Sequence, residues 1–552
     1  MIKFNTLLEY VDNLSKERPD QVWLRDRQRD EFTEWTWSQA RAEINAVSAW
    51  LERQYGASRA NMALLSRNRA HWVMSELAIM GSGNVSIPLF TTLATPTAQY
   101  IFEFTETRVL FLGESQNSSA VLSILSESVD IVTLPGVEID ADHTKWEDIV
   151  ADCAGLGPEY RSKHDDLITM VFTSGTTGVP KGVMQTHDSL ILPMQNTEHY
   201  FSIEANPRFL SYLPLSHIAE LQLIFVQSLT YAGMITFNES LETLARDMAD
   251  TKPHFFFGAP RVWEQLQQGV LAMFGSQQAL DSAMEANSEQ VGLKVRMALG
   301  LHEAGYLLTG AAPISPALIK WYHSLGLHLM EGFGQTEIMA TTINTEAQHR
   351  IGSIGRVVDN VDLKITDEGE LAFRSRGAAI GYYKMPEKTA ETFVDGWIHT
   401  GDKGYIDEDG FVFLTGRVKD YFKTIQGKFV APAPIESRFA ANEWTEQICL
   451  LGRGYSKTVI ACVLTESAQK HDRDVIDNAL REQVDLVNAE VDKHEHIGAV
   501  MVSIQAWTIE NEMLTPTLKI RRDEVEGQFG ERARELAHEA AVQQTCRIEW
   551  LE

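Results

Sequence analysis

Short apolar runs rich in β-branched residues alternate with helical patterns in the first part of this chain. Residues 62–66 and 85–89 have strand patterns, and residues 70–80 between them have helical spacing. Residues 108–113 and 130–134 repeat the strand pattern. Strands and helices that alternate at this spacing predict an α/β fold with a largely parallel sheet.

The pattern changes from about residue 360 onward. Residues 361–366, 370–374 and 410–416 are short strand patterns separated by Asp-Glu-Gly and Asp-Gly turns, which predicts a small antiparallel unit or barrel. A chain of 552 residues is too long for one ordinary core and predicts two or more domains. Composition alone does not mark the boundary between them.

The chain is acidic, with a formal net charge of −28. This charge argues against a general binder of nucleic acids or anionic membranes, since both need a positive face. The acidity also favours solubility, and any anionic ligand must be captured by a local cluster. The four cysteines have neither metal-ligand spacing nor a disulfide framework, which suits a reducing compartment.

We expect a cytoplasmic protein. The first residues lack the charged and apolar regions of a signal peptide, and no stretch approaches the roughly 20 apolar residues that span a bilayer. Peripheral contact with membranes stays open, although no basic amphipathic helix supports it. The sequence does not indicate an oligomeric state.

A run of hydroxyls, glycines and one lysine at residues 173–182 follows the apolar segment 167–172. Its side chains can hydrogen-bond phosphate oxygens, its glycines let backbone N–H groups approach an anion, and its lysine supplies charge. The order differs from a Walker A loop, and an ordinary polar turn is the alternative. The predicted phosphate-binding residues are Thr173, Ser174, Gly175, Thr176, Thr177, Gly178 and Lys181.

Four further motifs follow in order. They are Gly-Phe-Gly-Gln-Thr-Glu at 332–337, His-Thr-Gly-Asp at 399–402, Gly-Arg-Val-Lys-Asp at 416–420 and Pro-Thr-Leu-Lys at 516–519. Together with the run at 173–182 they resemble the AMP-forming acyl-CoA synthetases of the adenylate-forming superfamily, which also contains luciferases and peptide-synthetase adenylation domains. The resemblance extends from about residue 20 to about residue 525, and five ordered motifs make it specific.

The resemblance implies a domain organisation. Residues 1–416 would form a large α/β domain of several subdomains, with parallel sheets and a small β-barrel, that binds AMP and the acyl group. Residues 417–552 would form a small mobile α+β lid, with its hinge near Lys419. Rotation there would bring Lys519 into the site for one step and residues 424–428, including Gly427, towards the CoA path for the next.

The implied reaction has two steps and uses ATP, Mg²⁺ and coenzyme A. A fatty acid carboxylate attacks the α-phosphate of ATP to give acyl-AMP and pyrophosphate, and CoA then takes the acyl group. Charge builds on the phosphate, so positioning and electrostatic stabilisation are the main tasks. By resemblance Lys519 bridges the carboxylate, the α-phosphate and the ribose side, whereas a lysine in a polar loop is more often simply solvated.

The resemblance also gives roles to the middle motifs. Thr336 would contact the α-phosphate and Glu337 would bind Mg²⁺, because hard cations prefer carboxylate and phosphate oxygens. A Thr-Glu pair also commonly begins a helix. Phe333, where the family commonly has tyrosine, would stack on adenine, and Asp402 and Arg417 would contact the ribose. The full predicted set of nucleotide contacts here is Gly310, Ala311, Ala312, Gly332, Phe333, Gly334, Gln335, Asp402 and Arg417.

The resemblance also bears on the identity of the acid. Residues 212–220 and the final motif resemble long-chain fatty acid–CoA ligases, but the chain is shorter than many of them, so medium-chain and non-fatty acids stay open. His217 borders the acyl pocket in this interpretation, or is simply packed. An acyl-AMP ligase that delivers to a carrier protein is the alternative within the superfamily, and a nucleotide-binding regulator or an oxidative light emitter lies outside this chemistry.

Overall fold

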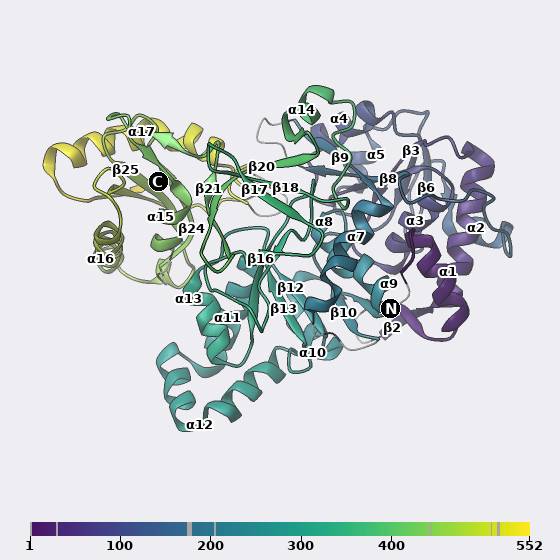
Figure 1. The fold of residues 1–552 in the computed structure, drawn as a ribbon, viewed down its shortest axis with the longest axis horizontal. Coiled ribbons are helices and arrows are strands. Elements are labelled where there is room, and N and C mark those ends of the chain that lie inside the picture. The colour runs from purple at the N-terminus through teal and green to yellow at the C-terminus, as the bar shows by residue number, and fades with distance from the viewer. Residues whose placement is uncertain are drawn as a thin grey trace.

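The computed structural model describes residues 3–28, 31–173, 179–201, 203, 206–440, 442, 444–508, 511–515 and 519–551. In Figure 1 the N-terminal elements lie on the right of the molecule and the elements after β21 lie on the left. The helix α12 (Gln277–Ala298) projects from the lower edge. Among the described residues, no helix combines the length and the apolar character that crossing a bilayer requires.

The predicted parallel sheet is present in the first 190 residues. Its strand order is β7-β6-β5-β3-β4-β8-β9, and every neighbouring pair is parallel except the final hairpin of β8 and β9. Its strands are β3 (Asn61–Leu65), β4 (Val85–Leu89), β5 (Val109–Leu112), β6 (Asp130–Thr133), β7 (Thr144–Lys145), β8 (Leu167–Thr173) and β9 (Lys181–Thr186). The strand patterns at 62–66, 85–89, 108–113 and 130–134 are thereby confirmed.

A second sheet contains nine strands in the order β16-β15-β14-β13-β12-β10-β11-β1-β2. Its central pairs are parallel, and antiparallel pairs occur at both edges. Its strands are β1 (Val22–Gln28), β2 (Glu31–Thr36), β10 (Arg208–Ser211), β11 (Met234–Phe237), β12 (Phe255–Gly258), β13 (Tyr306–Thr309), β14 (Leu329–Phe333), β15 (Thr342–Ile343) and β16 (Arg356–Val357).

Helix α3 (Ala70–Gly81) lies between the two sheets. Every one of its residues is buried, and it contacts β3, β4 and β8 of one sheet and β1 of the other. A helix that is buried all round needs such a position, because it has no face for water. The main core therefore joins both sheets, with further helices from α1 to α13 around them: α1 (Leu7–Glu17), α2 (Trp37–Tyr55), α4 (Thr95–Thr105), α7 (His187–Thr197), α9 (Gln227–Tyr231), α10 (Leu244–Thr251), α11 (Pro260–Phe274) and α13 (Pro316–Ser324).

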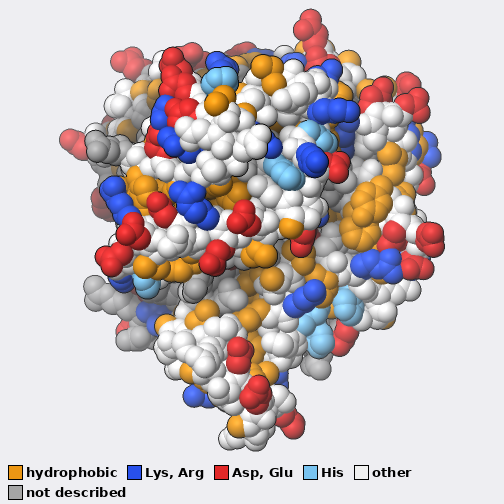
Figure 2. Space-filling view, turned by 90° about the vertical axis from the view of Figure 1, so that its left-hand side faces the viewer, with side chains coloured by type: hydrophobic (Ala, Val, Ile, Leu, Met, Phe, Trp, Pro, Cys, Tyr) orange, Lys and Arg blue, Asp and Glu red, His pale blue; other side chains and the backbone are white. Residues whose placement is uncertain are grey.

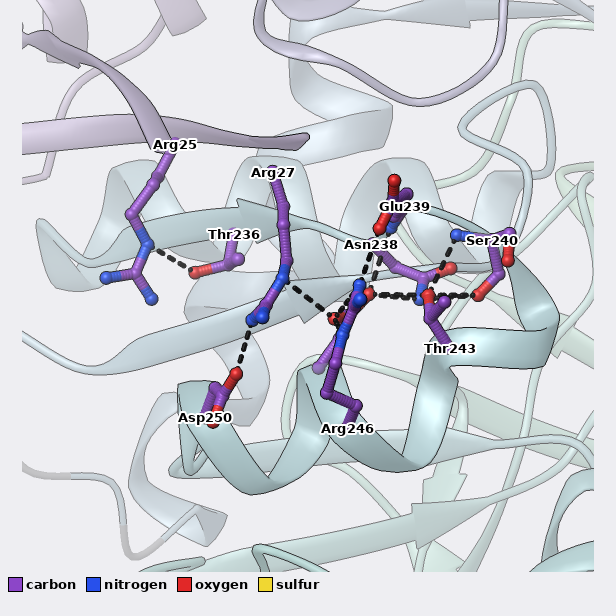
Figure 3. A network of polar contacts seen from close by, with 10 residues as sticks. Arg25, Arg27, Thr236, Asn238, Glu239, Ser240, Thr243, Arg246 and Asp250 are labelled. Atoms are coloured by element: carbon purple, nitrogen blue, oxygen red, sulfur yellow. Dashed lines mark hydrogen bonds and ion pairs between the residues drawn. The ribbon is translucent and has the colours of Figure 1, made fainter. Parts of the chain in front are cut away.

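A buried network of charges attaches β1 to α10 and to the loop after β11 (Figure 3). Asp247 is 0% exposed, and its carboxylate accepts from Arg27, Asn238 and Thr243 at 3.3, 2.9 and 2.9 Å. Arg27 also pairs with Asp250. Because a buried charge without its partners costs several kilocalories per mole, this network fixes the register of the sheet edge.

The predicted antiparallel unit follows the second sheet. It is a five-stranded sheet, with β17-β18-β20-β19 in order and β21 paired with β20. The pairings among the described residues form an open ladder, so this unit is a sheet rather than the predicted barrel. Its strands are β17 (Asp362–Ile365), β18 (Glu370–Arg374), β19 (Phe393–Val394), β20 (Trp397–Ile406) and β21 (Val412–Arg417), and α14 (Pro386–Thr392) precedes β19.

The chain after β21 forms its own sheet and its own core. Four strands in the order β24-β25-β26-β27 pack against two long helices, and a short hairpin of β22 and β23 precedes them. This α+β unit agrees with the predicted fold class. Its elements are β22 (Phe422–Lys423), β23 (Phe429–Val430), α15 (Pro432–Phe439), β24 (Thr445–Leu451), β25 (Thr458–Leu464), α16 (Arg473–Glu490), β26 (Ile497–Ser503), α17 (Arg522–Gln543) and β27 (Arg547–Leu551).

Candidate functional site

The predicted phosphate-binding run lies at the turn between β8 and β9. Thr173 ends β8 and pairs in register with Lys181, the first residue of β9. Gly182 has no room for a side chain, because a Cβ there would lie 2.9 Å from the ring of Phe172. The residues between them that the sequence predicts, Ser174, Gly175, Thr176, Thr177 and Gly178, lie outside the described residues.

The Thr336-Glu337 pair lies in a bend after β14, and no helix begins there. Ile338 instead forms an antiparallel bridge with Ala378, so the helix-start alternative is wrong at this position. The carbonyl oxygen of Thr336 accepts from Gln185 Nε2 at 2.7 Å. The motif is therefore tied to β9, which also carries Lys181.

The two predicted adenine segments follow neighbouring parallel strands. β13 ends at Thr309 and β14 at Phe333, so residues 310–312 and 332–334 emerge at the same edge of the sheet. A Cβ on Gly310 would lie 2.9 Å from the carbonyl oxygen of Gly332, and Ala311 has a positive φ of 66°. This close approach of two backbones gives a flat wall of the kind that a base can lie against. Phe333, Gly334 and Ala312 belong to the same two segments.

Asp402 is bound on both sides by predicted site residues. Its Oδ2 accepts from Gln335 Nε2 at 2.7 Å, and its Oδ1 lies 3.1 Å from Arg417 Nε, the residue opposite it in the β20–β21 ladder. Burial raises the pKa of Asp402, and the charge of Arg417 opposes that rise. The ladder thus joins the motifs at 332–337, 399–402 and 416–420 at one place.

Lys519 reaches this place from the C-terminal unit. The residue has accessible surface, yet surrounding protein desolvates its ammonium group and, with Arg417, lowers its pKa to about 8. The charges of Asp402 and Glu337 act in the opposite direction. The ammonium group of Lys519 thus lies among the charged groups around Asp402. Its neighbours Pro516, Thr517 and Leu518 in the final motif lie outside the described residues.

His217 lies near the same lysine and is neutral. Its Nδ1 accepts from the N–H of Ala219 at 3.2 Å, at the start of the short helix α8 (Ile218–Glu220). Burial, and after it the charge of Lys519, lowers the pKa of His217 to about 4. A neutral imidazole that accepts at Nδ1 carries its proton on Nε2. His217 is packed, as the plainer interpretation requires, and also lies next to the predicted site.

Two predicted residues, Lys419 and Gly427, lie outside the group of residues around Asp402. Lys419 is exposed in the turn after β21, and its charge reaches Lys181. Gly427 lies at the turn of the β22–β23 hairpin with a positive φ of 75°. The hairpin bonds to its own unit, since the N–H of Ile425 donates to the carbonyl oxygen of Tyr455 at 3.0 Å.

Sequence reasoning missed Tyr382, which touches both charged ends of the site. Its hydroxyl donates to Glu337 Oε1 at 2.6 Å, and the ammonium group of Lys181 lies 4.7 Å from its ring centroid. The tyrosine follows Gly381 in a segment with no recognisable motif, so only its contacts reveal it.

The charges on the outer face of the C-terminal unit are mixed. Lys and Arg side chains alternate there with Asp and Glu, with apolar side chains among them (Figure 2). Lys and Arg side chains do not form a broad cluster on this face (Figure 2). Binding of an anionic ligand therefore depends on the local groups described above.

Two family models match the chain. The model described as AMP-binding enzyme matches residues 11–383, and the model described as AMP-binding enzyme C-terminal domain matches residues 419–540. Between them they cover most of the sequence and every motif except residues 399–402 and the start of 416–420.

Curated relatives cover nearly the whole chain at low identity. Fatty acyl-CoA synthetase A of Dictyostelium discoideum is 25% identical over 92% of this chain and 86% of its own length. Long-chain-fatty-acid–CoA ligase 1 of Cavia porcellus is 27% identical over 95% of this chain and 84% of its own length.

A solved structure confirms the fold. The A domain of carboxylic acid reductase from Segniliparus rugosus, in complex with AMP and a co-purified carboxylic acid, superposes with a TM-score of 0.81 at 21% identity. The match covers 97% of this chain and 94% of that chain.

Proposed function

The chain belongs to the family of AMP-binding enzymes, and we propose that it activates a fatty acid with ATP and transfers the acyl group to coenzyme A. The observation that carries this proposal is the meeting of Lys519 with Glu337, Asp402 and Arg417, since these residues come from distant parts of the chain. The names of the curated relatives, a fatty acyl-CoA synthetase and a long-chain-fatty-acid–CoA ligase, support the substrate class.

In the first step a carboxylate oxygen forms a bond to the α-phosphorus of ATP. The bond between that phosphorus and the bridging oxygen to the β-phosphate breaks, so pyrophosphate leaves with its electron pair. Negative charge builds on the α-phosphate oxygens, and the ammonium group of Lys519 would stabilise it. Asp402 would accept from the ribose hydroxyls while Arg417 orients its carboxylate at 3.1 Å.

In the second step the CoA sulfur forms a bond to the acyl carbon. The bond between that carbon and the phosphate oxygen breaks, AMP leaves, and the thiol proton passes to solvent. In the present arrangement Lys519 interacts with the charges of Glu337, Asp402 and Arg417, and we propose that the unit after residue 416 rotates about Lys419 between the steps. The gap between the two matched family models, residues 384–418, supports a boundary here.

The residues present fit a divalent cation on the nucleotide. Glu337 offers a carboxylate, the oxygen ligand that Mg²⁺ prefers beside phosphates. Its Oε1 is engaged by the Tyr382 hydroxyl, which leaves Oε2 for the cation. When bound, Mg²⁺ would neutralise part of the phosphate charge, and Lys181 would add its ammonium charge from β9.

The segment that follows His217, the residue predicted to border the acyl pocket, favours an apolar substrate. Residues 218–226 are buried, and residues 221–226 form a π-helical segment, a rare conformation that often accompanies functional sites. A fatty chain of long or medium length is our choice. Delivery to a carrier protein, or a non-fatty carboxylate, are the alternatives that the same first step would serve.

The test measures pyrophosphate release over a panel of straight-chain acids from two to eighteen carbons, with CoA present or withheld. We expect pyrophosphate release to rise with the chain length of the acid. We expect a thioester to form only when CoA is present. Lys519→Ala should abolish acyl-AMP formation while largely sparing thioester formation from supplied acyl-AMP. Lys320→Ala, at an exposed lysine on α13, is the matched control. No release with any acid would overturn the proposal.

A further inference from the structure

One extended segment, residues 378–383, connects the two charged ends of the site. Ala378 bridges Ile338, and the N–H of Ala379 donates to the carbonyl oxygen of Glu337 at 2.9 Å. Further along, Tyr382 bridges Val183. The segment therefore bonds to the Glu337 bend at one end and to β9 at the other, which fixes the separation of Glu337 from Lys181.

The side chain of Tyr382 lies between Glu337 and Lys181. Only 4% of it is exposed, and its hydroxyl donates to Glu337 Oε1 at 2.6 Å. The ammonium group of Lys181 lies over the face of the same ring, 4.7 Å from its centroid. One aromatic ring thus engages a cation with its face and an anion with its edge substituent.

This arrangement has an electrostatic consequence. Lys181 and Glu337 attract one another, and the charge of Glu337 raises the pKa of Lys181 against the lowering by burial. Yet in the described part of the chain the two do not approach within the 4.0 Å of an ion pair. A direct pair would occupy both the ammonium group and the carboxylate, and neither would then be available to a ligand.

We infer that Tyr382 is a positioning residue that holds the Glu337 carboxylate and the Lys181 ammonium group apart, so that both face the metal-bound phosphates of a nucleotide. The inference rests on the proposed function for the identity of the ligand, but its geometry does not. The hydroxyl directs Glu337 so that Oε2 faces the cation, and the ring face retains Lys181 without neutralising it.

A purely structural role is the competing explanation. The ring of Tyr382 packs edge-on against Phe393 at 5.6 Å, and its N–H donates to Thr389 Oγ1 at 3.0 Å. Tyr382→Phe keeps the ring, its packing and the cation contact, and removes only the hydroxyl. Any change in the behaviour of Glu337 in this variant is then separate from packing.

The experiment measures binding of α,β-methylene-ATP, which the enzyme cannot cleave, by titration calorimetry at graded Mg²⁺ concentrations. Without the hydroxyl, Glu337 turns towards Lys181, and the Mg²⁺ concentration for half-maximal binding should rise about tenfold, the factor expected for one charged hydrogen bond. Thioester formation from supplied acyl-AMP, which needs no polyphosphate, should stay within about twofold of the native rate.

Tyr383→Phe is the matched control. Its hydroxyl accepts from Asn61 Nδ2 at 3.2 Å, and its ring contacts Phe104 edge-on at 5.9 Å. Loss of that hydroxyl should leave the Mg²⁺ dependence unchanged, because the residue touches neither charged group. Thermal unfolding of both variants verifies that the fold is retained.

A second variant tests the same idea from the other side. Lys181→Met removes the competing cation, so adding Tyr382→Phe to it should raise the half-saturating Mg²⁺ concentration by less than about threefold. A Tyr382→Phe protein with native Mg²⁺ dependence, or an equal loss in both half-reactions, would overturn the inference. Failure to release pyrophosphate with any acid would overturn the proposed function instead, and the binding measurement would still decide the role of Tyr382.

Discussion

Arg261 of α11 and Glu446 of β24 form an ion pair that joins the N-terminal sheets to the C-terminal unit. Arg261 is 39% exposed and Glu446 is 25% exposed, and Arg261 also approaches Glu264 at 3.6 Å. The pair forms while Lys519 lies beside Asp402 and Glu337. In the proposed two-step reaction this arrangement serves the first half-reaction, and the pair would stabilise it.

Breaking the pair between Arg261 and Glu446 should reduce the fraction of molecules in which the C-terminal unit is arranged for acyl-AMP formation. A half-exposed pair contributes up to about 1 kcal/mol, equivalent to about fivefold in an equilibrium. We expect Glu446→Gln to slow acyl-AMP formation by up to about fivefold, without slowing thioester formation from supplied acyl-AMP. Both half-reactions are measured separately, at low salt.

Two variants control for this prediction. The charge swap Arg261→Glu with Glu446→Arg should restore the native ratio of the two rates, because it rebuilds the pair. Arg350→Ala removes a pair with Asp407 that lies wholly before residue 416, and should leave the ratio unchanged. A native ratio in Glu446→Gln would contradict the role of the pair.

The lowered pKa of Lys519 predicts the alkaline limit of the first step. The folded protein lowers this pKa to about 8, so the fraction of charged ammonium falls as pH rises through that value. The kcat/KM for ATP in pyrophosphate release should then fall about tenfold per pH unit above it, because this parameter reports the free enzyme. Rates are measured from about pH 6 to about pH 10.

Lys519→Arg is the informative comparison for this profile. Arginine stays charged throughout this range, so the fall near pH 8 should vanish in the variant even where the rate is lower. A fall at the same pH in Lys519→Arg would assign the limit to another group.

Rotation about Lys419 makes a different prediction. Ile425 and Phe429 of the β22–β23 hairpin are 68% and 60% exposed, so they are free to contact another surface after a rotation. Lys419→Pro fixes φ at this position. We expect it to slow thioester formation by about tenfold or more while changing acyl-AMP formation far less.

The two half-reactions again provide the measurement. Lys423→Pro would alter strand β22 itself, so Asp367→Pro, in the exposed turn between β17 and β18, is the better control for general damage from proline. If both half-reactions survive Lys419→Pro unchanged, the two steps do not require rotation at this residue.

The sequence predicted the parts of the fold that depend on local pattern. The strands at 85–89 and 370–374 match β4 and β18, because runs of apolar residues bounded by turns are local signals. The motifs also predicted a cluster of Lys519, Glu337 and Asp402, but only through the resemblance. The run at 174–178 lies outside the described residues, so the phosphate contacts stay a prediction.

The contacts that the sequence did not predict join residues that are far apart along the chain. Tyr382 and Glu337 are 45 positions apart, and Arg261 and Glu446 are 185 positions apart, so no local pattern relates them. The Thr336-Glu337 pair shows the converse error, since a good local helix start is overridden by a bridge from Ile338 to Ala378. Tertiary pairing decides where local preference is weak.

The buried carboxyl of Glu220 predicts how stability depends on pH. Glu220 is 0% exposed, and burial raises its pKa from the ordinary value of 4.5 to about 8. Its Oε1 accepts from the N–H of Tyr212 at 3.0 Å, and its Oε2 has no partner in the described structure. The folded protein therefore holds this proton between those two pH values, whereas the unfolded chain releases it.

The direction of this pH dependence follows from the number of protons that the folded and the unfolded states bind. The folded state binds more protons than the unfolded state between about pH 4.5 and about pH 8, so the free energy of unfolding falls as pH rises through this window and levels off above it. Glu220→Gln removes this titration. Its stability relative to the native protein should improve by on the order of 5 kcal/mol between the two ends of the window, measured by urea unfolding. Glu289→Gln, at an exposed position of α12, should show no such gain, and a gain independent of pH in Glu220→Gln would mean that Glu220 is already ionised in the folded protein.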